Sequence, residues 1–372
     1  MILGIDISTY FEEERINHPT YLVNGQKVDP IQVMVNQGIK YLRTRIWNRP
    51  YDDEGHPYLA GTADLDNYIK LAKLCQKYGF KFVADFHYSD FWADPGKQTC
   101  PKDWLNLSFE KVEDNVYKFT KESLLKIKQA GLDTEFVQIG NEITNGMIWP
   151  YGKLDESVNP RGNYENLCRL LKAGIRGAKE VYPNIKIIIH LERSYDQYIY
   201  NEYFSHLNKY DVQYDIIGMS YYPYWHGTFE QFFANVNMCQ KTFNKDVMVM
   251  ELGYSFTLED YITSGSQAQL VINENNVSEM LKTLPEPISP EGQANFVKRF
   301  LKLAKQNNVK GVFYWEPFWV PGDGICWASK EGQAYIHEEG KSTRNEWCNQ
   351  CLFDYSANAL PALFEFNVKN IK

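Results

Sequence analysis

Two glutamates end apolar, strand-like stretches of this sequence, where a carboxylate serves no packing purpose. Glu142 follows Asn141 at the end of residues 134–142, and Glu251 lies near the end of residues 246–252. Burying a carboxylate is costly unless it is paired or hydrogen-bonded. Two carboxyl groups in one cleft can cleave a glycosidic bond, because one protonates the leaving oxygen and the other attacks the anomeric carbon. The residue types therefore indicate the chemistry of a glycoside hydrolase, provided that the fold brings both side chains together.

These two stretches belong to a series of apolar runs that recurs along the chain. Each run is short, mostly β-branched and bounded by polar residues, glycine or proline, which is typical of buried strands. The runs are residues 2–8, 40–47, 80–87, 134–142, 185–191, 214–221, 246–252 and 309–316. Helical spacing lies between them, most clearly in residues 64–78, 109–130, 164–181 and 289–306. Asp64 or Thr62 is the candidate N-cap of the first of these helices.

Strand–helix alternation without a linker predicts an α/β fold, a (β/α)8 TIM barrel. We expect one catalytic domain over residues 1–372. Each strand–helix unit averages about 44 residues, which is long for this fold, so the βα loops must be enlarged. An open doubly wound sheet is the structural alternative, but no G-x-G-x-x-G follows the first run to support it.

Polar residues collect at the C-terminal ends of the runs, whereas the N-terminal halves are nearly all apolar. In a (β/α)8 barrel the active site lies at those ends. The ends carry Asp6, Arg45, Trp47, Asp85, His87, Asn141, Glu142, His190, Tyr221, Tyr222, Glu251, Trp315 and Glu316. The fourth and seventh strands face each other across the barrel mouth, so Glu142 and Glu251 can flank one bond.

The neighbours of the two glutamates suggest their roles. We predict that burial keeps Glu142 protonated as the acid/base, while Arg45 and His87 keep Glu251 ionised as the nucleophile. At a bulged strand end Asn141 can also face the cleft, where its amide can hold the sugar 2-hydroxyl. The structural alternative is that either glutamate is only the ion-pair partner of an arginine in the second run.

Six stretches of the chain share long motifs with one known family. They are YLRTRIWNRPYD, DFHYSDFWADPGKQ, VQIGNEITNGMIWP, DIIGMSYYPYWHGT, GVFYWEPFW and CLFDYSANALPAL. Together they resemble the arabinogalactan endo-β-1,4-galactanases, glycoside hydrolase family 53, almost from Gly4 to Pro361. The resemblance implies a (β/α)8 barrel that retains anomeric configuration. It also implies that Glu142 is the acid/base, Glu251 the nucleophile and Asn141 the amide that orients the 2-hydroxyl.

The resemblance further implies residues that support the nucleophile or form the floor of the sugar site. The matching positions are Arg45, His87, Tyr222 and Trp315. Only strand phase separates Arg45 from Arg43, and Tyr222 from Tyr221; we assign Arg45 and Tyr222.

Aromatic residues make up 15% of the chain, and many lie in the predicted βα loops. Their faces can stack on the apolar faces of sugars. The candidate loop platforms are Trp92, Trp149, Trp225, Trp319 and Trp327, and we expect about half of them to bind sugar while the others pack within the loops. The predicted substrate-binding set is Asn141, Arg45, His87, Asp85, Trp92, Tyr222, Trp225, Trp315 and Trp149.

Two segments around the seventh run depart from the family. Leu252 and Gly253 follow the predicted nucleophile, where family members usually carry a threonine and a small residue. The next loop offers Glu259, Asp260 and residues 273–276 as oxygen ligands, but it lacks the alternating acidic pattern with which some bacterial members hold calcium. We expect no cofactor, with calcium in this loop as the alternative.

The loop after the last run contains Cys326, His337, Cys348 and Cys351 in a C-x10-H-x10-C-x2-C arrangement. Four such ligands could hold zinc, although the spacing is irregular. A disulfide from Cys326 to Cys348 or Cys351 would suit an exported protein. Ordinary reduced cysteines are the interpretation that we retain.

The overall charge argues against nucleic acid as a partner, because the formal net charge is −8, the pI is about 5.5 and no basic stripe is present. No apolar run approaches the roughly 20 residues needed to span a bilayer. We therefore expect a polysaccharide substrate, no membrane partner and a monomer. Met1 leads directly into a predicted strand, without a signal peptide before it. We expect a secreted or periplasmic protein whose leader is not part of this sequence, with an intracellular protein as the alternative.

Three functions are compatible with this sequence. The first is an endo-acting hydrolase of β-1,4-galactan and type I arabinogalactan, the side chains of pectin, for which the resemblance is the reason. The second is a related retaining hydrolase of another β-1,4-glycan, such as mannan. The third is a glycan-binding barrel without catalysis, which would be expected to lack one of the two carboxylates.

Overall fold

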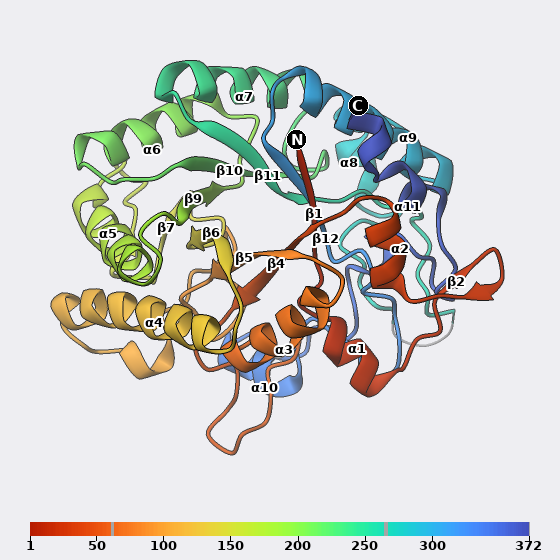
Figure 1. Ribbon diagram of the computed structural model, residues 1–372, viewed down its shortest axis with the longest axis horizontal. Coiled ribbons are helices and arrows are strands. Elements are labelled where there is room, and N and C mark those ends of the chain that lie inside the picture. The colour runs from red at the N-terminus through yellow and green to blue at the C-terminus, as the bar shows by residue number, and fades with distance from the viewer. Residues whose placement is uncertain (61–62, 264–266, 372) are drawn as a thin grey trace.

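A closed barrel of parallel strands forms the centre of the protein. The computed structural model describes residues 1–60, 63–263 and 267–371. Within these residues the strand order is β1-β12-β11-β10-β9-β6-β5-β4, and β1 pairs with β4 to close the barrel (Figure 1). The strands are β1 (Ile2–Asp6), β4 (Tyr41–Ile46), β5 (Lys81–Phe86), β6 (Thr134–Ile139), β9 (Lys186–Leu191), β10 (Ile216–Tyr221), β11 (Asp246–Leu252) and β12 (Gly311–Trp315). Each strand lies within one predicted run, which confirms the predicted (β/α)8 fold.

Helices surround the barrel (Figure 1). They are α1 (Tyr10–Ile16), α2 (Pro30–Asn36), α3 (Leu65–Gln76), α4 (Phe109–Gln129), α5 (Tyr164–Val181), α6 (Gln197–Lys209), α7 (Phe229–Phe243), α8 (Val277–Met280), α9 (Pro290–Gln306), α10 (Lys330–Tyr335) and α11 (Pro361–Glu365). The helices α3, α4, α5 and α9 confirm the four predicted helical stretches. Asp64 caps α3 by accepting a hydrogen bond from the backbone N–H of Asn67 at 2.8 Å, and Thr62, the other candidate cap, lies outside the described residues.

None of these helices, within the part of the chain that the structure describes, has the length and apolar character needed to cross a lipid bilayer.

The enlarged loops carry small elements of their own and pack against one another. The small elements are the hairpins β2 (Leu22–Val23) with β3 (Gln26–Lys27) and β7 (Gly146–Met147) with β8 (Gly152–Lys153), and the 3-10 helices η1 (Lys102–Trp104), η2 (Cys348–Gln350) and η3 (Val368–Ile371). The indole N–H of Trp92, after β5, donates to the carbonyl of Trp327, after β12, at 2.9 Å. The loops that follow β5 and β12 therefore support each other.

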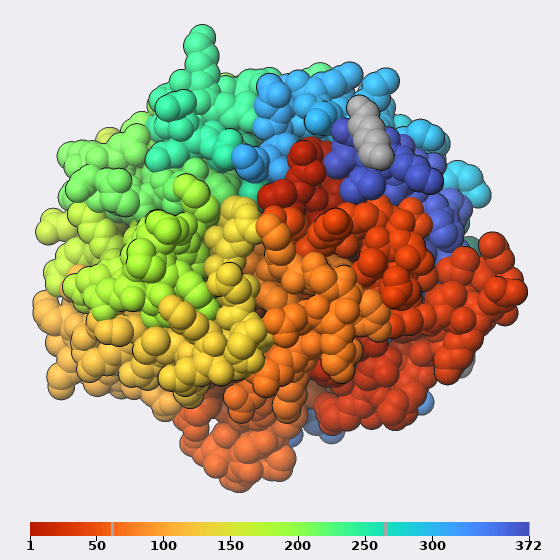
Figure 2. All heavy atoms as spheres, in the orientation of Figure 1, coloured from red at the N-terminus to blue at the C-terminus, as the bar shows by residue number. Residues whose placement is uncertain are grey.

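An apolar layer fills the barrel near the N-terminal ends of the strands. It contains Val83, Phe136, Ile188, Ile216, Met248, Met250 and Phe313, with Ile2 and Tyr41 packed against it. Full burial of one such side chain contributes about 1.5–3 kcal/mol. The dark red start of the chain is visible above the centre of Figure 2, surrounded by side chains of the neighbouring segments. The apolar layer therefore closes the interior of the barrel at this end.

The hairpin β7–β8 follows Glu142 closely and depends on Gly146. Gly146 has a φ of +87°, and a Cβ there would overlap the carbonyl oxygen of Gly152. We expect Gly146→Ala to lower the free energy of unfolding by at least about 2 kcal/mol, because it combines a left-handed backbone with a backbone clash. Urea or thermal unfolding measures this loss.

Gly131→Ala is the matched control, because Gly131 also has a positive φ of +77° but no atom within 4 Å of the added Cβ. We expect it to cost about 1 kcal/mol through backbone conformation alone. Equal losses for the two variants would contradict the role of close packing at Gly146.

Candidate active site

A layer of polar side chains lies directly above the apolar layer. Alternate residues of a strand point to the same side, so His190, two positions after the apolar-layer residue Ile188, also points into the barrel. The layer consists of Asp6, Arg43, Asp85, Gln138, His190 and Ser220, all of them buried. Periodicity along the strands therefore places a polar network at the predicted end of the barrel.

A β-bulge turns Glu251 into this network. The pairing of β11 shifts register against both β10 and β12 near Met250, so that Glu251 pairs with Ser220. Bulges beside active sites commonly redirect a side chain in this way. The Glu251 carboxylate accepts a hydrogen bond from the Arg43 guanidinium at 3.2 Å and one from the Tyr222 hydroxyl at 2.9 Å.

A turn with two left-handed residues places Glu142. Gly140 has a φ of +82° and Glu142 itself a φ of +49°, which a residue other than glycine rarely adopts. The turn lets both Asn141 and Glu142 face the cleft, as the sequence predicts for an irregular strand end. The Glu142 Oε1 lies 2.5 Å from the Ser220 Oγ.

The two glutamates lie close enough to act on one bond. A carboxylate oxygen of Glu142, one of Glu251 and a ring nitrogen of His190 all lie within 4.8 Å of one another. Burial, together with Glu251 and Glu192, raises the pKa of Glu142 well above its ordinary value. Burial also raises the pKa of Glu251, but Arg43 and the Tyr222 hydroxyl oppose this rise. Glu251 therefore loses its proton first, and Glu142 keeps its proton to higher pH.

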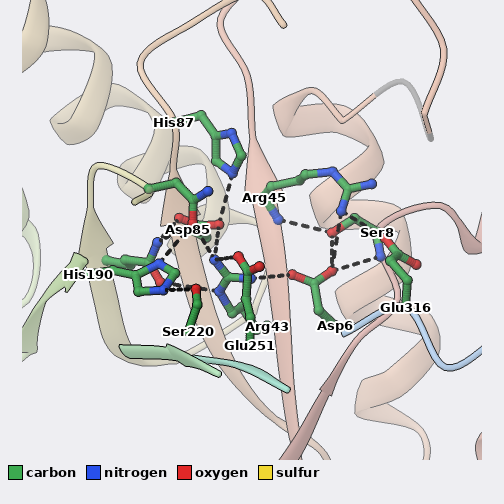
Figure 3. A network of polar contacts seen from close by, with 12 residues as sticks. Asp6, Ser8, Arg43, Arg45, Asp85, His87, His190, Ser220, Glu251 and Glu316 are labelled. Atoms are coloured by element: carbon green, nitrogen blue, oxygen red, sulfur yellow. Dashed lines mark hydrogen bonds and ion pairs between the residues drawn. The ribbon is translucent and has the colours of Figure 1, made fainter. Parts of the chain in front are cut away.

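The contact predicted for Arg45 belongs to Arg43, which corrects the sequence assignment. Arg43 lies at the centre of the network in Figure 3, between Asp6 and Asp85 at 2.9 and 2.8 Å and near Glu251. Arg45 turns toward Glu316 instead, at 2.8 Å. Both arginines have the same strand phase, and the one that lies deeper in the barrel, Arg43, reaches Glu251.

Arg45 has a different position in the cleft. Its guanidinium carbon lies 4.4 Å from the ring centroid of Trp92, and 5.7 Å from that of Trp315. Cation–π contacts of this kind hold aromatic rings in a fixed orientation. Arg45 therefore lines the cavity as predicted, but by supporting aromatic side chains and not the nucleophile.

Strand phase does separate Tyr222 from Tyr221. Tyr222 faces Glu251, whereas Tyr221 points outward, packs 4.5 Å from Phe232 between ring centroids, and donates its hydroxyl to Gly227. The choice of Tyr222 thus agrees with the geometry.

A cavity of ≈ 510 Å³ opens above the two glutamates. Its aromatic lining consists of Trp92, Tyr195, Tyr222, Trp225, Trp315, Trp319, Trp327 and Trp347, and its polar lining includes Arg43, Arg45, His87, Asn141, Glu142, Glu192, Glu251 and Glu346. Four of the five candidate tryptophan platforms therefore lie at the cavity. Three residues of the lining, Trp347, Glu192 and Glu346, were not predicted, because they lie in loops or just after a strand. Burial raises the pKa of Glu192 and of Glu346 to about 7.

Two predicted substrate-binding residues do not reach the cavity. Among the described residues its lining omits Trp149, whose indole N–H donates to the Asn145 carbonyl at 3.1 Å and whose ring faces Lys153. The role of Trp149 as a sugar platform is therefore not supported, because the hairpin turns its ring away. Asp85 lies below the cavity, where it pairs with Arg43 and, at 3.1 Å, with His87.

His87 lines the cavity but makes no contact with Glu251 among the hydrogen bonds of the described residues. Its Nδ1 accepts a hydrogen bond from the Trp47 indole at 3.1 Å, and burial lowers its pKa. A neutral His87 adds no positive charge beside the nucleophile, so the predicted electrostatic support comes from Arg43.

Two groups of described residues bring three potential metal ligands together. Asp52, Glu54 and His56 form an exposed group, and the other is Glu142 with His190 and Glu251. The Arg43 guanidinium beside Glu251 disfavours a cation at the second group, and we assign that group to acid–base chemistry.

Two loops carry the residues that the sequence suggested as zinc, disulfide or calcium sites: the loop after β12 for the cysteines and the loop after β11 for calcium. Cys326, Cys348 and Cys351 are buried free thiols, as the reduced interpretation predicts, and with His337 they form no ligand group in the described ranges. In the loop after β11 the Asp260 carboxylate accepts hydrogen bonds from the backbone N–H groups of Ile262 and Ala268, at 2.9 and 2.8 Å. Residues 264–266 of that loop lie outside the described residues, and the absence of a cofactor stays a prediction.

Comparison with known proteins identifies the family. Residues 2–366 match the sequence profile described as "Glycosyl hydrolase family 53". The chain belongs to glycosyl hydrolase family 53. The endo-beta-1,4-galactanase of Bacillus subtilis is 36% identical over 98% of this chain and 85% of that protein. A probable arabinogalactan endo-beta-1,4-galactanase A of Aspergillus fumigatus is 32% identical over 85% of this chain and 84% of that protein.

A solved structure supports the same family at the level of the fold. The GH53 catalytic domain of Ignisphaera aggregans matches with a TM-score of 0.86 at 32% identity, covering 98% of this chain and 95% of that one. Membership of family 53 thus confirms the resemblance drawn from the sequence motifs, while the roles of single residues in this chain stay predictions.

Mutation of Tyr222 tests its hydrogen bond to Glu251, the predicted nucleophile. Tyr222→Phe removes a donor that stabilises ionised Glu251, so the pKa of Glu251 rises and the acid limb of the pH profile of kcat/KM moves to higher pH. We expect kcat/KM at its optimum to fall about 10-fold to 100-fold, the value of one hydrogen bond to a charged group.

Tyr221→Phe is the matched control, since it removes a hydroxyl that points away from the cavity. It should cost about 1 kcal/mol of stability and leave kcat/KM unchanged. A loss of kcat/KM as large as that of Tyr222→Phe would show that hydroxyl removal acts through the fold.

Proposed function

We propose that the protein is an endo-acting β-1,4-galactanase that hydrolyses β-1,4-galactan and type I arabinogalactan with retention of configuration. The observation that carries the chemistry is the pair Glu142 and Glu251, with carboxylate oxygens within 4.8 Å of each other at the floor of the cavity. Retaining glycosidases hold their carboxyl groups about 5–5.5 Å apart, and inverting ones about 6.5–9.5 Å apart to admit a water. The short separation supports retention.

The reaction has two steps. The Glu251 carboxylate attacks the anomeric carbon while Glu142 gives its proton to the departing glycosidic oxygen, so that a glycosyl ester forms and the leaving sugar departs. Glu142, now a carboxylate, takes a proton from water, and the resulting hydroxide attacks the anomeric carbon and releases Glu251. Substrate and water balance both steps, so the proposal includes no cofactor.

Asn141 fits the role of a handle on the sugar ring. Its Nδ2 donates one hydrogen to the Ala93 carbonyl at 2.9 Å, and the amide lines the cavity beside both glutamates. The second Nδ2 hydrogen is then available to a sugar hydroxyl next to the reacting carbon. The tryptophan rings around it offer apolar faces on which neighbouring sugars can stack.

The choice of galactan depends on the relatives. The Bacillus subtilis protein is named an endo-beta-1,4-galactanase, and the Aspergillus fumigatus protein a probable arabinogalactan endo-beta-1,4-galactanase A. A hydrolase of another β-1,4-glycan, such as mannan, is less well supported, and a binding protein without catalysis has no use for the paired carboxyl groups.

Incubation of the protein with galactan, mannan and xylan, followed by product analysis, tests this function. We expect oligosaccharides of mixed length from galactan alone at an early stage, because an endo-acting enzyme cuts within the chain, and short galacto-oligosaccharides as these fragments are cut further. Release of manno- or xylo-oligosaccharides with galactan left intact would contradict the proposed substrate, and no release from any glycan would contradict the proposed catalysis.

The products formed with azide distinguish the proposed roles of the two glutamates. Glu251→Ala should lower kcat by at least about 10⁴-fold, and added azide should restore turnover as a glycosyl azide of inverted configuration. With an aryl galactoside whose leaving group needs no proton, Glu142→Ala still forms the glycosyl ester, so azide should yield a glycosyl azide of retained configuration. Near-normal activity of Glu251→Ala, or the two configurations exchanged, would overturn the assignment of roles.

A further inference from the structure

A chain of hydrogen bonds joins the two glutamates, and two of its members, His190 and Ser220, have no part in the reaction above. From Glu251 it passes through Arg43 and Asn141 to His190, and from His190 through Ser220 to Glu142. We propose that Ser220 and His190 are positioning residues of the acid/base, in which the single hydroxyl hydrogen of Ser220 turns from His190 to Glu142 when Glu142 releases its proton. This inference deepens the proposed function and rests on the acid/base role of Glu142.

The orientation of the Asn141 amide sets the direction of the hydrogen bonds in this series. Its Oδ1 accepts hydrogen bonds from the Arg43 guanidinium at 2.7 Å and from the Gln138 amide at 3.0 Å, while its Nδ2 donates to the Ala93 carbonyl. Neither arginine nor an amide nitrogen can accept a hydrogen bond, so this orientation of the Asn141 amide is fixed. The His190 Nδ1, 3.0 Å from the same Oδ1, must therefore carry a hydrogen.

The next link is the other ring nitrogen. His190 is fully buried, and burial together with Arg43, His87 and His226 lowers its pKa well below the ordinary value. A neutral imidazole with its hydrogen on Nδ1 has a lone pair on Nε2. The Ser220 Oγ, 2.9 Å from Nε2, is the donor to that lone pair.

The last link connects this arrangement to the state of Glu142. A hydroxyl has one hydrogen, and when Ser220 gives it to His190, the contact with the Glu142 Oε1 needs a hydrogen from Glu142. The resting arrangement therefore requires a protonated Glu142. Glu251, Glu192 and Asp94 face Glu142 and favour the same neutral form.

Release of the Glu142 proton reverses the direction of the hydrogen bond between Ser220 and Glu142. Once Glu142 has given its proton to a leaving group, its Oε1 can only accept a hydrogen bond. Ser220 then turns its hydrogen to Oε1, and the His190 Nε2 loses its donor. No proton is gained or lost in this turn. A buried acceptor without a partner is unfavourable, so His190 favours the protonated form of Glu142 through Ser220.

A double-mutant cycle tests this link. His190→Asn keeps a donor toward Asn141 but removes the acceptor that faces Ser220. Ser220 can then donate its hydrogen to ionised Glu142 without leaving a buried acceptor unpaired. We expect the basic limb of the pH profile of kcat/KM to move about half to one pH unit lower, the value of one neutral hydrogen bond. In a Ser220→Ala background the same substitution should leave the basic limb unchanged, because His190 acts only through Ser220. An equal shift in both backgrounds, or no shift in either, would overturn the proposal.

Ser194→Ala is the matched control. Ser194 is a buried serine whose hydroxyl donates to the backbone carbonyl of Ser220 at 2.7 Å, and it has no part in the chain. We expect this variant to lose stability and to keep the wild-type basic limb. A shift of the limb in Ser194→Ala would show that general loosening around Ser220 produces the effect, and would overturn the proposal.

The unaltered protein offers a measurement that needs no variant and no substrate. With ¹⁵N-labelled histidine, NMR distinguishes a ring nitrogen that carries hydrogen from one with a lone pair. We expect His190 to be neutral with its hydrogen on Nδ1 at neutral pH, and a hydrogen on Nε2 there would overturn the proposal. If the protein cleaves no glycan, the proposed function fails while this measurement still decides the hydrogen-bond direction.

Discussion

The whole site depends on one buried cation, Arg43. Its guanidinium contacts Asp6, Asp85 and Glu251 within 2.8–3.2 Å and is only 1% exposed. Removing such charges from water costs several kcal/mol for each ion unless geometry and further hydrogen bonds compensate. Burial lowers the pKa of Arg43, but the three carboxylates raise it by more than burial lowers it. The arginine therefore stays charged. Its planar, forked shape then holds several acceptors at fixed angles.

This cation also explains why two chemically identical side chains differ. Glu251 accepts a hydrogen bond from Arg43, whereas Glu142 lies beyond the arginine, beside the uncharged Ser220. A further ionised carboxylate in the same buried space would face repulsion from Glu251 and Glu192 without a cation of its own. Glu251 and Glu142 thus differ because of their distance from one guanidinium, and the path of hydrogen bonds from Arg43 through Asn141 connects them.

A second arginine connects the barrel to the walls of the cavity. Arg45 pairs with Glu316 at the end of β12, and Glu316 in turn accepts hydrogen bonds from Thr9 after β1. On its other side Arg45 faces the rings of Trp92 and Trp315. Segments from the start, the first third and the end of the chain therefore meet at one side chain, so the aromatic walls of the cavity are coupled to the closure of the barrel.

The local features of the site follow directly from the amino-acid pattern. Apolar runs and capped helices are set by periodicity and by nearest neighbours, which is why the strands, the four clearest helices and the polar strand ends were predictable. Glu142 and Glu251 were identifiable because burying a carboxylate at the end of an apolar strand is costly unless it is paired, so its presence there indicates a function. Phase alone also separates Tyr222 from Tyr221, since the two point to opposite faces.

By itself, the sequence determined the barrel, its polar end and the two glutamates. Only the tertiary structure decided that Arg43 reaches Glu251 while Arg45 reaches Glu316, because both have the same phase and their depth depends on how the strands are staggered around the barrel. It likewise decided that Trp347 lines the cavity and Trp149 does not, since loop packing orients these rings. The link from His190 through Ser220 to Glu142 joins three strands or strand ends, and no pattern along one strand can reveal a contact that arises from the register between strands.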